Sequence, residues 1–534
     1  MSTLLLTDGA VELQRRRNVT LVTILAVGAL LFLLPLVFPL GIARDYPNHL
    51  ARVFIQYRLG GDALLAENYA IAWRLIPDLA MDLLAAPFAG WLSPYWLGAL
   101  FNGLTLLLLY SAGIALHWRQ RGELSLWPLL LVALLFNEAL RWGFMNFLFG
   151  VGLALWVLFF WLASEAWPWR RRLLVFAAAQ LVLFFAHLLG FMLCGYLILG
   201  LELLRAWRDR DRSLGDRLQV FVRHMAQFAV PLLLFAYVVF VQDGVGDSRT
   251  AYGAIGAKAM AFLSPTSALA APGGPLVLLA VLLLLYGLQR RGHMVLDKDL
   301  KVLLWAMLAL VVAMPNMVLG IWGLDFRFPF VALLLFVAAV HPSAEIAASR
   351  LFRGFLHGLV AVALLTGGLQ LARNDGEQQA IRQALAEAEA GGALLVAGDY
   401  DPACPRCFPD WIDFMHSGSL AAIENAMFVP LLFTATSPVE ASPRRRALDV
   451  PHGWPVTRQD LEEGRDRPLS EPRHPHDPAH AYWHDWPYNF DYLLWLRREG
   501  SDLDGLRGLE RLAEGRVFVL YRVIAPPPKG GSAR

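Results

Sequence analysis

Long apolar runs recur through the first 372 residues of the chain and then stop. Each run is bounded by polar residues, glycine or proline, which is the pattern of helices that cross a membrane. Eleven runs are candidate spans, at about 19–43, 96–117, 125–139, 147–164, 173–187, 190–204, 226–242, 275–289, 302–319, 328–341 and 354–372. Several are shorter than the roughly 20 residues needed to cross the hydrocarbon, so the count holds to within about two. The pattern predicts a polytopic α-helical membrane protein.

The pattern changes after residue 372 to that of a small α/β domain. A helix rich in Gln, Ala and Glu is predicted near 375–390, and a β-like apolar run follows at 393–400. The stretches "FDYLLWLRR" and "GRVFVLYRVI" are predicted as two further strands. Residues 438–480 are rich in Pro, Arg, Asp and His and are predicted to be irregular.

Two domains follow from this change of pattern. Residues 1–372 are predicted to form the transmembrane domain, with a long first outer loop at 44–95, and residues 373–534 a soluble domain. The loop is amphipathic and aromatic, with Trp73, Trp91, Tyr95 and Trp96. Trp and Tyr prefer the headgroup level, so interfacial helices are expected here. They would be either a structural cover or one wall of a groove open to lipid.

The distribution of Lys and Arg predicts the orientation of the chain. With the N-terminus inside, the inner segments carry 20 Lys and Arg in 78 residues, and the outer loops carry 8 in 103 residues. This asymmetry follows the positive-inside rule. An odd number of spans then places residues 373–534 outside the membrane. The first run is too long for a signal peptide and is predicted to be an anchor.

Composition supports a membrane protein and adds little about partners. Hydrophobic residues make up 57% of the chain and charged residues 17%, against about 45–50% and about 25% in ordinary globular proteins. The net charge of +2 names no partner, and no nucleic-acid partner is expected. Neither GxxxxGK[ST] nor a GxGxxG after a strand occurs, so no nucleotide-binding loop is predicted.

Polar residues from five separate loops converge on the predicted outer face, and they form the main functional signal. They are Arg44, Asp45, His49 and Arg52, then Glu138 and Arg141, then His187, then Asp243, Asp247, Arg249, Tyr252 and Lys258, and finally Asp325 and Arg327. Charges near a membrane are costly and are commonly functional.

Each of these residues also has a structural interpretation. Asp45, two residues before Pro47, is a common helix-start signal, and its carboxylate could cap the helix. If a helix follows, Asp45 and His49 can face the same side. His187 could make an ordinary interhelical hydrogen bond. Glu138 with Arg141, and Asp325 with Arg327, could simply form pairs.

The arrangement resembles the GT-C superfamily of integral membrane glycosyltransferases. The resemblance rests on an acid shortly after the first span, a long first outer loop, about eleven spans and a soluble C-terminal domain. "DFRFPF" at 325–330 also resembles the Arg-aromatic-x-x-Pro stretch before a late span, with Pro329 one position early. "DYPNHLAR" departs from the Asp-Glu and Asp-Asp pairs of some members, which leaves metal use and acceptor type open.

The resemblance implies transfer of a sugar from a polyprenyl-phosphate donor to a glycan, lipid or protein acceptor. Asp45 is the expected base for the acceptor hydroxyl, with His49 as its orienting partner or a second base. Arg327, Lys258 and Arg141 are the expected phosphate contacts, and His187 would contact phosphate, a carboxylate or sugar. The remaining candidate substrate contacts are Asp325, Glu138, Arg52 and Tyr252. The expected location is the bacterial cytoplasmic membrane.

Metal binding is less well supported. Asp45 and His49 have ligand spacing, but two residues do not make a site, so no metal ligand is assigned and a divalent ion stays open. The tract with His474, His476, His480 and His484 is either a metal site or a solvated loop. Cys404 and Cys407 fit a local disulfide, zinc or a redox role.

Two other classes of function remain open at this stage. A transporter or flippase of lipid-linked saccharides would place polar residues deep in several spans and show a two-fold repeat. A non-catalytic envelope assembly protein would use its outer domain for binding and would tolerate the loss of Asp45.

Overall fold

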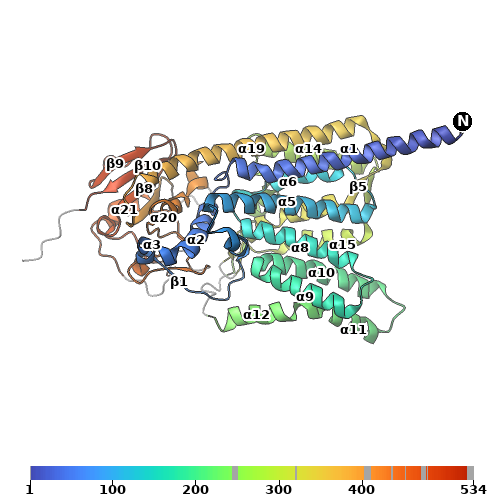
Figure 1. The fold of residues 1–534 in the computed structure, drawn as a ribbon, viewed down its shortest axis with the longest axis horizontal. Helices are drawn as coiled ribbons and strands as arrows, with labels where there is room; N and C mark the ends of the chain where they lie inside the picture. Colours follow the sequence, from blue (N-terminus) through green and yellow to red (C-terminus); the bar gives the residue numbers. More distant parts are fainter. Residues whose placement is uncertain are drawn as a thin grey trace, which may run out of the picture. The chain divides into compact units, whose positions relative to one another are not determined.

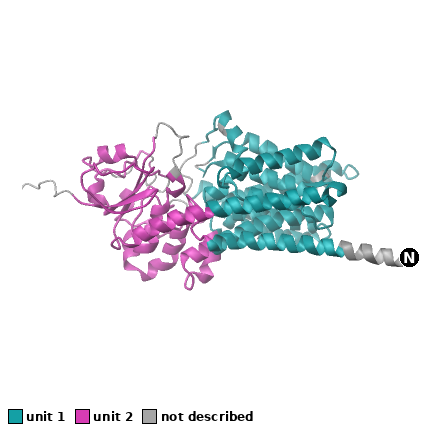
Figure 2. Cartoon of the chain, turned by 90° about the horizontal axis from the view of Figure 1, so that it is seen from above, with its two compact units in different colours: residues 1–37, 77–80, 100–370 teal, residues 38–76, 81–99, 371–534 magenta. Residues whose placement is uncertain are grey.

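The structure is a computed structural model that describes residues 2–242, 250–318, 321–401, 410–434, 437–450, 453–470, 477 and 479–525. The chain divides into two compact units, shown in teal and magenta in Figure 2. Unit 1 comprises residues 1–37, 77–80 and 100–370, and unit 2 comprises residues 38–76, 81–99 and 371–534.

Each of the eleven predicted spans coincides with helical structure. The helices are α1 (Ser2–Val37), α5 (Pro94–Arg121), the 3-10 helix η3 (Trp127–Leu130) with α6 (Leu131–Leu135), α8 (Met145–Ala163), α9 (Trp169–Ala186), α10 (Leu188–Arg208), α12 (Ala229–Phe240), α14 (Gly273–Arg290), α15 (Lys298–Ala313), α17 (Pro329–Ala339) and α19 (Arg350–Ala386). Shorter helices of unit 1 are α7 (Glu138–Arg141), α11 (Leu214–Met225), η4 (Ala226–Phe228), α13 (Ile255–Ala261), η5 (Ser264–Thr266), α16 (Leu324–Arg327) and α18 (Ala344–Ala348).

Seven helical stretches in the described part of the chain are long and apolar enough to cross a membrane. They are Gln14–Val37, Pro94–Arg121, Met145–Ala163, Leu188–Arg208, Leu214–Phe240, Gly273–Arg290 and Arg350–Ala386. Leu300–Ala313 is a shorter apolar helix. The prediction of a polytopic α-helical membrane protein is confirmed. The helix expected near 375–390 is not separate, because α19 runs on without a break to Ala386.

Close packing of α8 against α10 depends on two glycines. A Cβ added to Gly190 would lie 2.8 Å from the backbone of Gly150. A Cβ on Gly150 would lie 2.9 Å from the Cβ of His187. Small residues of this kind let two helix backbones approach within a membrane domain. The contact therefore fixes the position of His187 at the end of α9, and Figure 1 shows α8, α9 and α10 side by side.

One buried carboxylate ties α8, α10 and α11 together. Glu202 accepts hydrogen bonds from Trp161 Nε1 at 2.9 Å, Arg205 Nη1 at 2.7 Å and His224 Nδ1 at 2.6 Å. A charged side chain that is buried between helices is tolerated only when it is paired and hydrogen-bonded. The charges of Glu202 and Arg205 are therefore structural.

In unit 2, most of the long first loop folds together with the C-terminal region. Its elements are α2 (Tyr46–Arg58), η1 (Leu59–Gly61), α3 (Ala63–Asn68), β1 (Tyr69–Ile71), α4 (Ala80–Ala85) and η2 (Ala86–Phe88). Strand β1 pairs antiparallel with β7 (Val439–Ala441). The buried Asn68 amide donates to Gly391 O at 3.1 Å and Ala426 O at 2.8 Å. The loop and the C-terminal chain thus share one core.

The aromatic stretch of the loop leaves large apolar side chains exposed. Leu83, Leu84, Phe88, Trp91 and Trp96 are all exposed, Trp91 to 86%. Exposed tryptophans next to leucines are typical of segments at the membrane interface. Interfacial placement of this stretch stays a prediction.

The C-terminal region contains a four-stranded sheet with the order β6-β8-β10-β9. Strands β6 (Leu394–Gly398) and β8 (Tyr492–Leu496) are parallel, and β10 (Phe518–Val523) runs antiparallel to both β8 and β9 (Leu509–Glu514). The three predicted strands are confirmed. The sequence analysis did not predict the polar strand β9, because apolar and polar residues show little alternation along it.

Two short 3-10 helices and two short α-helices lie in this region outside the stretch at 438–480. They are η6 (Asp410–Phe414), η7 (Ser417–Ser419), α20 (Leu420–Asn425) and α22 (Trp486–Asn489). The stretch at 438–480 is not wholly irregular, since it contains β7, η8 (Arg446–Leu448) and α21 (Arg458–Gly464). The Thr457 and Asp460 capping box explains why α21 begins where it does.

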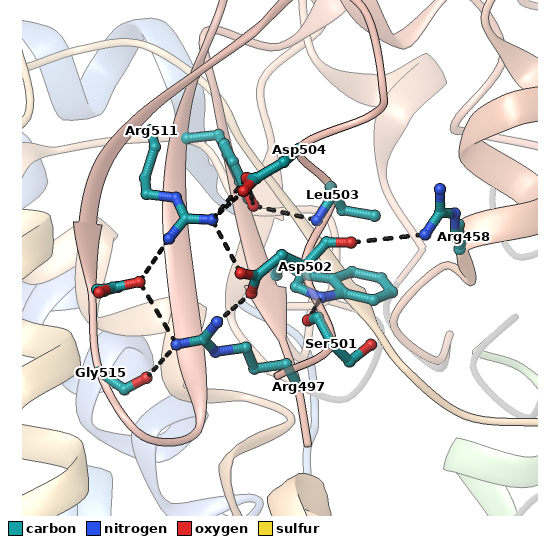
Figure 3. Close-up of polar contacts among 11 residues, drawn as sticks. Arg458, Arg497, Ser501, Asp502, Leu503, Asp504, Arg511 and Gly515 are labelled. Carbon is teal, nitrogen blue, oxygen red and sulfur yellow. Dashed lines mark hydrogen bonds and ion pairs between the residues drawn. The ribbon is translucent and has the colours of Figure 1, made fainter. Parts of the chain in front are cut away.

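A network of partly exposed ion pairs joins the β9–β10 hairpin to the loop after β8, as Figure 3 shows. Arg511 binds Asp502 at 2.9 Å, Asp504 at 2.6 Å and Glu514 at 2.6 Å. Arg497 binds Asp502 and donates to Gly515 O at 3.0 Å. Individual exposed pairs contribute little to stability, so the network mainly fixes the shape of the loop.

The glycine contact predicts a sharp difference between two Gly→Ala variants. Gly190→Ala places a methyl group against the Gly150 backbone and should lower stability by about 1–3 kcal/mol. Gly287→Ala, in α14 with nothing within 4 Å of the added carbon, should change stability by less than about 1 kcal/mol. Thermal unfolding of the full chain in detergent measures both. Equal melting temperatures would contradict the close contact.

Candidate functional site

The turn into α2 is held by the C-terminal region of unit 2. Arg44 has a left-handed backbone conformation, with φ of 52°, which is unfavourable for a residue with a side chain. Its backbone N–H donates to Asp413 O at 2.8 Å, and its Nε donates to Asp413 Oδ1 at 2.9 Å. Both side chains are buried. This buried pair fixes the residue that precedes Asp45.

Asp45 occupies the N-cap position of α2, but its carboxylate makes no capping hydrogen bond. Pro47 at the start of the helix needs no N–H partner and already favours helix initiation. The Asp45 Oδ1 atom lies 3.5 Å from Nε2 of His416, a residue between η6 and η7. The capping interpretation of Asp45 therefore does not hold for the side chain.

His416 is a buried and neutral histidine. Burial lowers the pKa of His416 to about 3, because the charged imidazolium loses hydration. Its Nδ1 has no hydrogen-bond partner within the described residues. The neutral ring can thus carry its proton on Nε2, which faces Asp45. The pair can hold a carboxylate in one orientation without neutralising it.

The ring of Phe433 lies against both histidines of this part of unit 2. Its centroid is 5.6 Å from that of His49 and 5.4 Å from that of His416, each in an edge-to-face arrangement. The His49 backbone N–H donates to Asp45 O at 3.2 Å. His416 therefore contacts Asp45, and the ring of Phe433 links His416 to His49. We call Asp45, His49, His416 and Phe433 the α2 cluster.

Arg52 lies about one helical turn after His49 in α2 and forms a buried ion pair. Its guanidinium contacts the carboxylate of Asp82, and both side chains are almost fully buried. Asp82 also accepts from Gln56 at 2.5 Å. This arrangement gives Arg52 a structural role between α2 and α4. A substrate contact for Arg52 stays a prediction.

In unit 1, His187 joins the end of α9 to the start of α10. Its Nδ1 accepts from the Leu189 backbone N–H at 3.1 Å, so the histidine caps α10 and carries its proton on Nε2 when neutral. Nε2 faces Asp78 Oδ1 at 3.8 Å. The ring also contacts Phe147, with centroids 5.6 Å apart.

Arg327 lies among aromatic rings in unit 1. Its guanidinium carbon is 3.7 Å from the ring centroid of Phe144 and 5.6 Å from that of Phe147. Nη2 donates to Trp322 O at 2.9 Å. Phe147 therefore contacts both Arg327 and His187 and brings these two predicted residues together.

Asp325 and Glu138 each have a polar partner of their own. Asp325 is buried and accepts from Asn316 Nδ2 at 2.9 Å. Glu138 Oε2 accepts from Ser267 Oγ at 2.5 Å. Arg141 ends α7, the four-residue helix that Glu138 begins. These contacts anchor the loops around the aromatic rings.

Lys258 and Tyr252 lie close to each other in space, and they come from a part of the chain that contains no other described candidate. The Lys258 Nζ is 5.8 Å from the Tyr252 ring centroid and donates to Val312 O at 2.5 Å. Tyr252 is exposed. Asp243, Asp247 and Arg249 lie outside the described residues.

The metal hypotheses receive no support in the described part of the chain. No group of three or more His, Cys, Asp or Glu side chains there is placed to hold an ion. Cys404, Cys407, His474 and His476 lie outside the described residues. His480 is buried, and its Nε2 contacts Ala447 O.

The sequence analysis did not predict several residues that contact the candidates, among them His416, Asp413 and Asp78. His416 and Asp413 lie more than 360 positions after Asp45, in a stretch that resembles an ordinary loop. Asp78 lies within the aromatic loop, in "IPDLAMD", where an acid near prolines suggests only a turn. No local pattern could have linked any of them to the candidates.

Comparison with known proteins identifies the fold. No protein-family model and no curated protein sequence matches the chain. The crystal structure of ArnT from Cupriavidus metallidurans bound to undecaprenyl phosphate is similar over 95% of this chain and 99% of that chain, with a TM-score of 0.50 and 12% identity. The fold is the GT-C fold. The same protein in its apo state gives a TM-score of 0.49, with 12% identity, over 94% of this chain and 97% of that one.

The GT-C fold confirms the resemblance inferred from the sequence. In the structure, unit 1 is the helical unit, and unit 2 combines most of the first loop with the C-terminal region. At 12% identity the similarity concerns the fold alone, so the roles of individual residues have to be argued from their own chemistry.

The depressed pKa of His416 predicts how stability depends on pH. The unfolded histidine takes up a proton near its ordinary pKa of 6.5, but the folded one does so only near pH 3. Between these values the unfolded state binds more protons, so His416 contributes to stability above pH 6.5 and loses that contribution as the pH falls. In His416→Leu, the melting temperature should fall less steeply with acid than in the wild type.

An exposed histidine supplies the control for this measurement. His357→Leu alters a side chain at the surface of α19 and should leave the acid dependence of the melting temperature close to that of the wild type. Identical pH profiles for His416→Leu and the wild type would mean that His416 is not buried in neutral form.

Proposed function

We propose that this chain is a membrane glycosyltransferase that transfers a sugar from a polyprenyl-phosphate donor. The acceptor is an envelope glycan, lipid or protein at the outer face of the bacterial cytoplasmic membrane. The N-terminus is cytoplasmic in this proposal, and the C-terminal region is extracytoplasmic, as the Lys and Arg distribution predicts. The GT-C fold and the absence of a nucleotide-binding loop from the sequence both support a lipid-linked donor.

The observation that carries the proposal is the contact between Asp45 and His416. A carboxylate at a helix start normally accepts a backbone N–H, whereas Asp45 faces a buried neutral imidazole at 3.5 Å instead. A carboxylate that is held in one orientation is suited to remove a proton from an acceptor hydroxyl. Asp45 is therefore assigned as the general base, with His49 beside it and His416 as a positioning residue.

The proposed reaction is a single displacement with inversion. The acceptor oxygen bonds to the anomeric carbon while the bond from that carbon to the phosphate oxygen breaks. The acceptor hydroxyl proton passes to Asp45, and the electron pair of the broken bond remains on the polyprenyl phosphate. The departing phosphate gains negative charge, which nearby cations must stabilise.

Residues of unit 1 are proposed to contact the donor. Arg327, Arg141 and Lys258 are assigned to the phosphate, Arg327 and Arg141 for the two-pronged geometry of the guanidinium. His187 is assigned to sugar or phosphate, through the Nε2 proton that faces Asp78. Asp325, Glu138 and Tyr252 complete the proposed substrate contacts.

The decisive test is Asp45→Asn in membranes that are supplied with polyprenyl-phosphate sugars. This variant keeps the size of the side chain and removes no capping bond, so the protein should fold normally. Sugar transfer should fall by about 100-fold to 10,000-fold, the usual contribution of a general base. Radiolabel transfer from donor to acceptor measures the rate.

Asp62→Asn is the matched control, because Asp62 lies in the same loop and caps α3 through Leu64 N and Leu65 N. Asparagine caps equally well, so transfer should persist. Unchanged transfer by Asp45→Asn would remove Asp45 as the base. No transfer by the wild type from any donor would favour the transporter or assembly alternatives.

His416 should act through Asp45 and not on its own. His416→Leu should lower kcat several-fold, since the carboxylate loses its orienting partner. In the Asp45→Asn background, His416→Leu should lower kcat no further. The effects of substituting two residues that act as one unit do not add. A full additional loss in the double variant would show that His416 has a separate role.

A further inference from the structure

One end of unit 1 is strongly basic. It is built from the end of α8, the start of α9, the end of α10 and α11. Residues 164–225 contain nine arginines and only five acidic residues. Three successive arginines, 170–172, begin α9, and its first turn contains no acid. Such a concentration of positive charge favours an anionic partner.

Four of the five acidic side chains of this region contact other groups within it. Glu165 contacts Arg205, Glu202 binds Arg205 and His224, and Asp209 pairs with Arg212 at 3.3 Å. Asp216 accepts from Ser213 Oγ at 2.7 Å. Arg170, Arg171 and Arg223 make no ion pair within the residues that the structure describes. Their charge is available to a ligand.

These three arginines lie over tryptophan rings. The guanidinium carbons of Arg170 and Arg223 are 5.7 and 5.5 Å from the ring centroid of Trp169, and that of Arg171 is 4.2 Å from the ring of Trp167. All three arginines are exposed. A guanidinium near an aromatic face keeps its N–H donors for another partner. The rings thus hold two-pronged donors at the surface.

The platform beneath these groups is rigid. Arg172 is buried and lies 3.5 Å from the ring of Trp161. It donates to Trp161 O at 2.8 Å and to Ser164 Oγ at 3.2 Å, and it contacts His224 Nε2 at 3.3 Å. The start of α9 is therefore fixed to α8 and α11. The exposed arginines on either side need little ordering to bind a ligand.

An exposed apolar surface adjoins the basic one. Leu214, Leu218 and Val222 follow one face of α11 at intervals of four residues and are 74, 58 and 57% exposed. Leu174 in α9 and Trp207 in α10 are also largely exposed. A ligand with both a phosphate and acyl chains would satisfy both surfaces, whereas free phosphate would satisfy only one.

We infer that the Arg170, Arg171 and Arg223 cluster is a binding site for an anionic phospholipid. The guanidinium groups bind the headgroup phosphate in pairs of hydrogen bonds, and the acyl chains lie along the apolar face of α11. Basic pockets between membrane helices at the cytoplasmic side bind anionic headgroups in this way. The predicted orientation places this end of unit 1 in the cytoplasmic leaflet. The inference does not depend on the proposed sugar transfer.

Native mass spectrometry of the full chain tests the site. The wild type, R170Q/R171Q/R223Q and the control R290Q/R291Q/R350Q are titrated with phosphatidylglycerol and with phosphatidylcholine of the same chains. The control removes three exposed arginines from other inner segments of the predicted topology. Each arginine near an anionic headgroup contributes about fivefold, so the first triple variant should bind phosphatidylglycerol at least about tenfold more weakly.

The other arms of the experiment separate the competing explanations. Three results together would support the site. The wild type binds phosphatidylglycerol more tightly than phosphatidylcholine, only the first triple variant loses this preference, and that variant keeps the wild-type melting temperature without added lipid. Equal losses in both triple variants would overturn it in favour of unspecific charge. Displacement of the lipid by excess inorganic phosphate, or equal binding of phosphatidylcholine, would overturn the assignment to an anionic phospholipid.

Discussion

The hydrocarbon of a membrane offers no partner to a polar group, and this constraint determines most of the structure. Backbone N–H and C=O groups must be satisfied within each segment, which leaves helices as the spanning element of unit 1. Charged side chains are tolerated where a partner is within reach, as Glu202 has in Arg205 and His224. Glycine is required where helix backbones approach, as Gly190 does at Gly150. Packing in unit 1 follows from these requirements.

The protein core of unit 2 imposes a related constraint, which buried ion pairs meet. Arg44 with Asp413, and Arg52 with Asp82, remove four charges from water inside a folded region that joins the first loop to the C-terminal chain. Each pair costs hydration, so it stabilises the protein mainly against the alternative of an unpaired buried charge. The Arg44 pair holds the start of α2, and the Arg52 pair holds the end of its second turn. Asp45 lies between them, and its position follows from theirs.

Asp45 and His187 show how one residue combines a structural and a functional role. His187 caps α10 through Nδ1, which leaves the Nε2 proton facing Asp78. Asp45 stands at a cap position without capping, and Pro47 makes that possible. In both cases a side-chain polar atom faces a residue outside the helix that it begins, His416 for Asp45 and Asp78 for His187.

The sequence by itself determined the fold class. Each of the eleven apolar runs coincides with helical structure, and seven helical stretches of the described residues are long and apolar enough to cross a membrane. Burial in lipid imposes a composition that is readable without any tertiary contact. Short apolar runs predicted β6, β8 and β10 for a similar reason, while the polar strand β9 lacked that signal. Asp45, His49, His187 and Arg327 were found because charge near a membrane is rare.

Only the tertiary structure decided which of these residues lie together. His416 and Asp413 join Arg44 and Asp45 across more than 360 positions, and no periodicity carries information over that distance. The burial that makes His416 neutral arises from the folded core of unit 2, and the sequence around it resembles any polar loop. A local pattern reports what a segment buries, whereas the partner of a buried group depends on how distant segments pack.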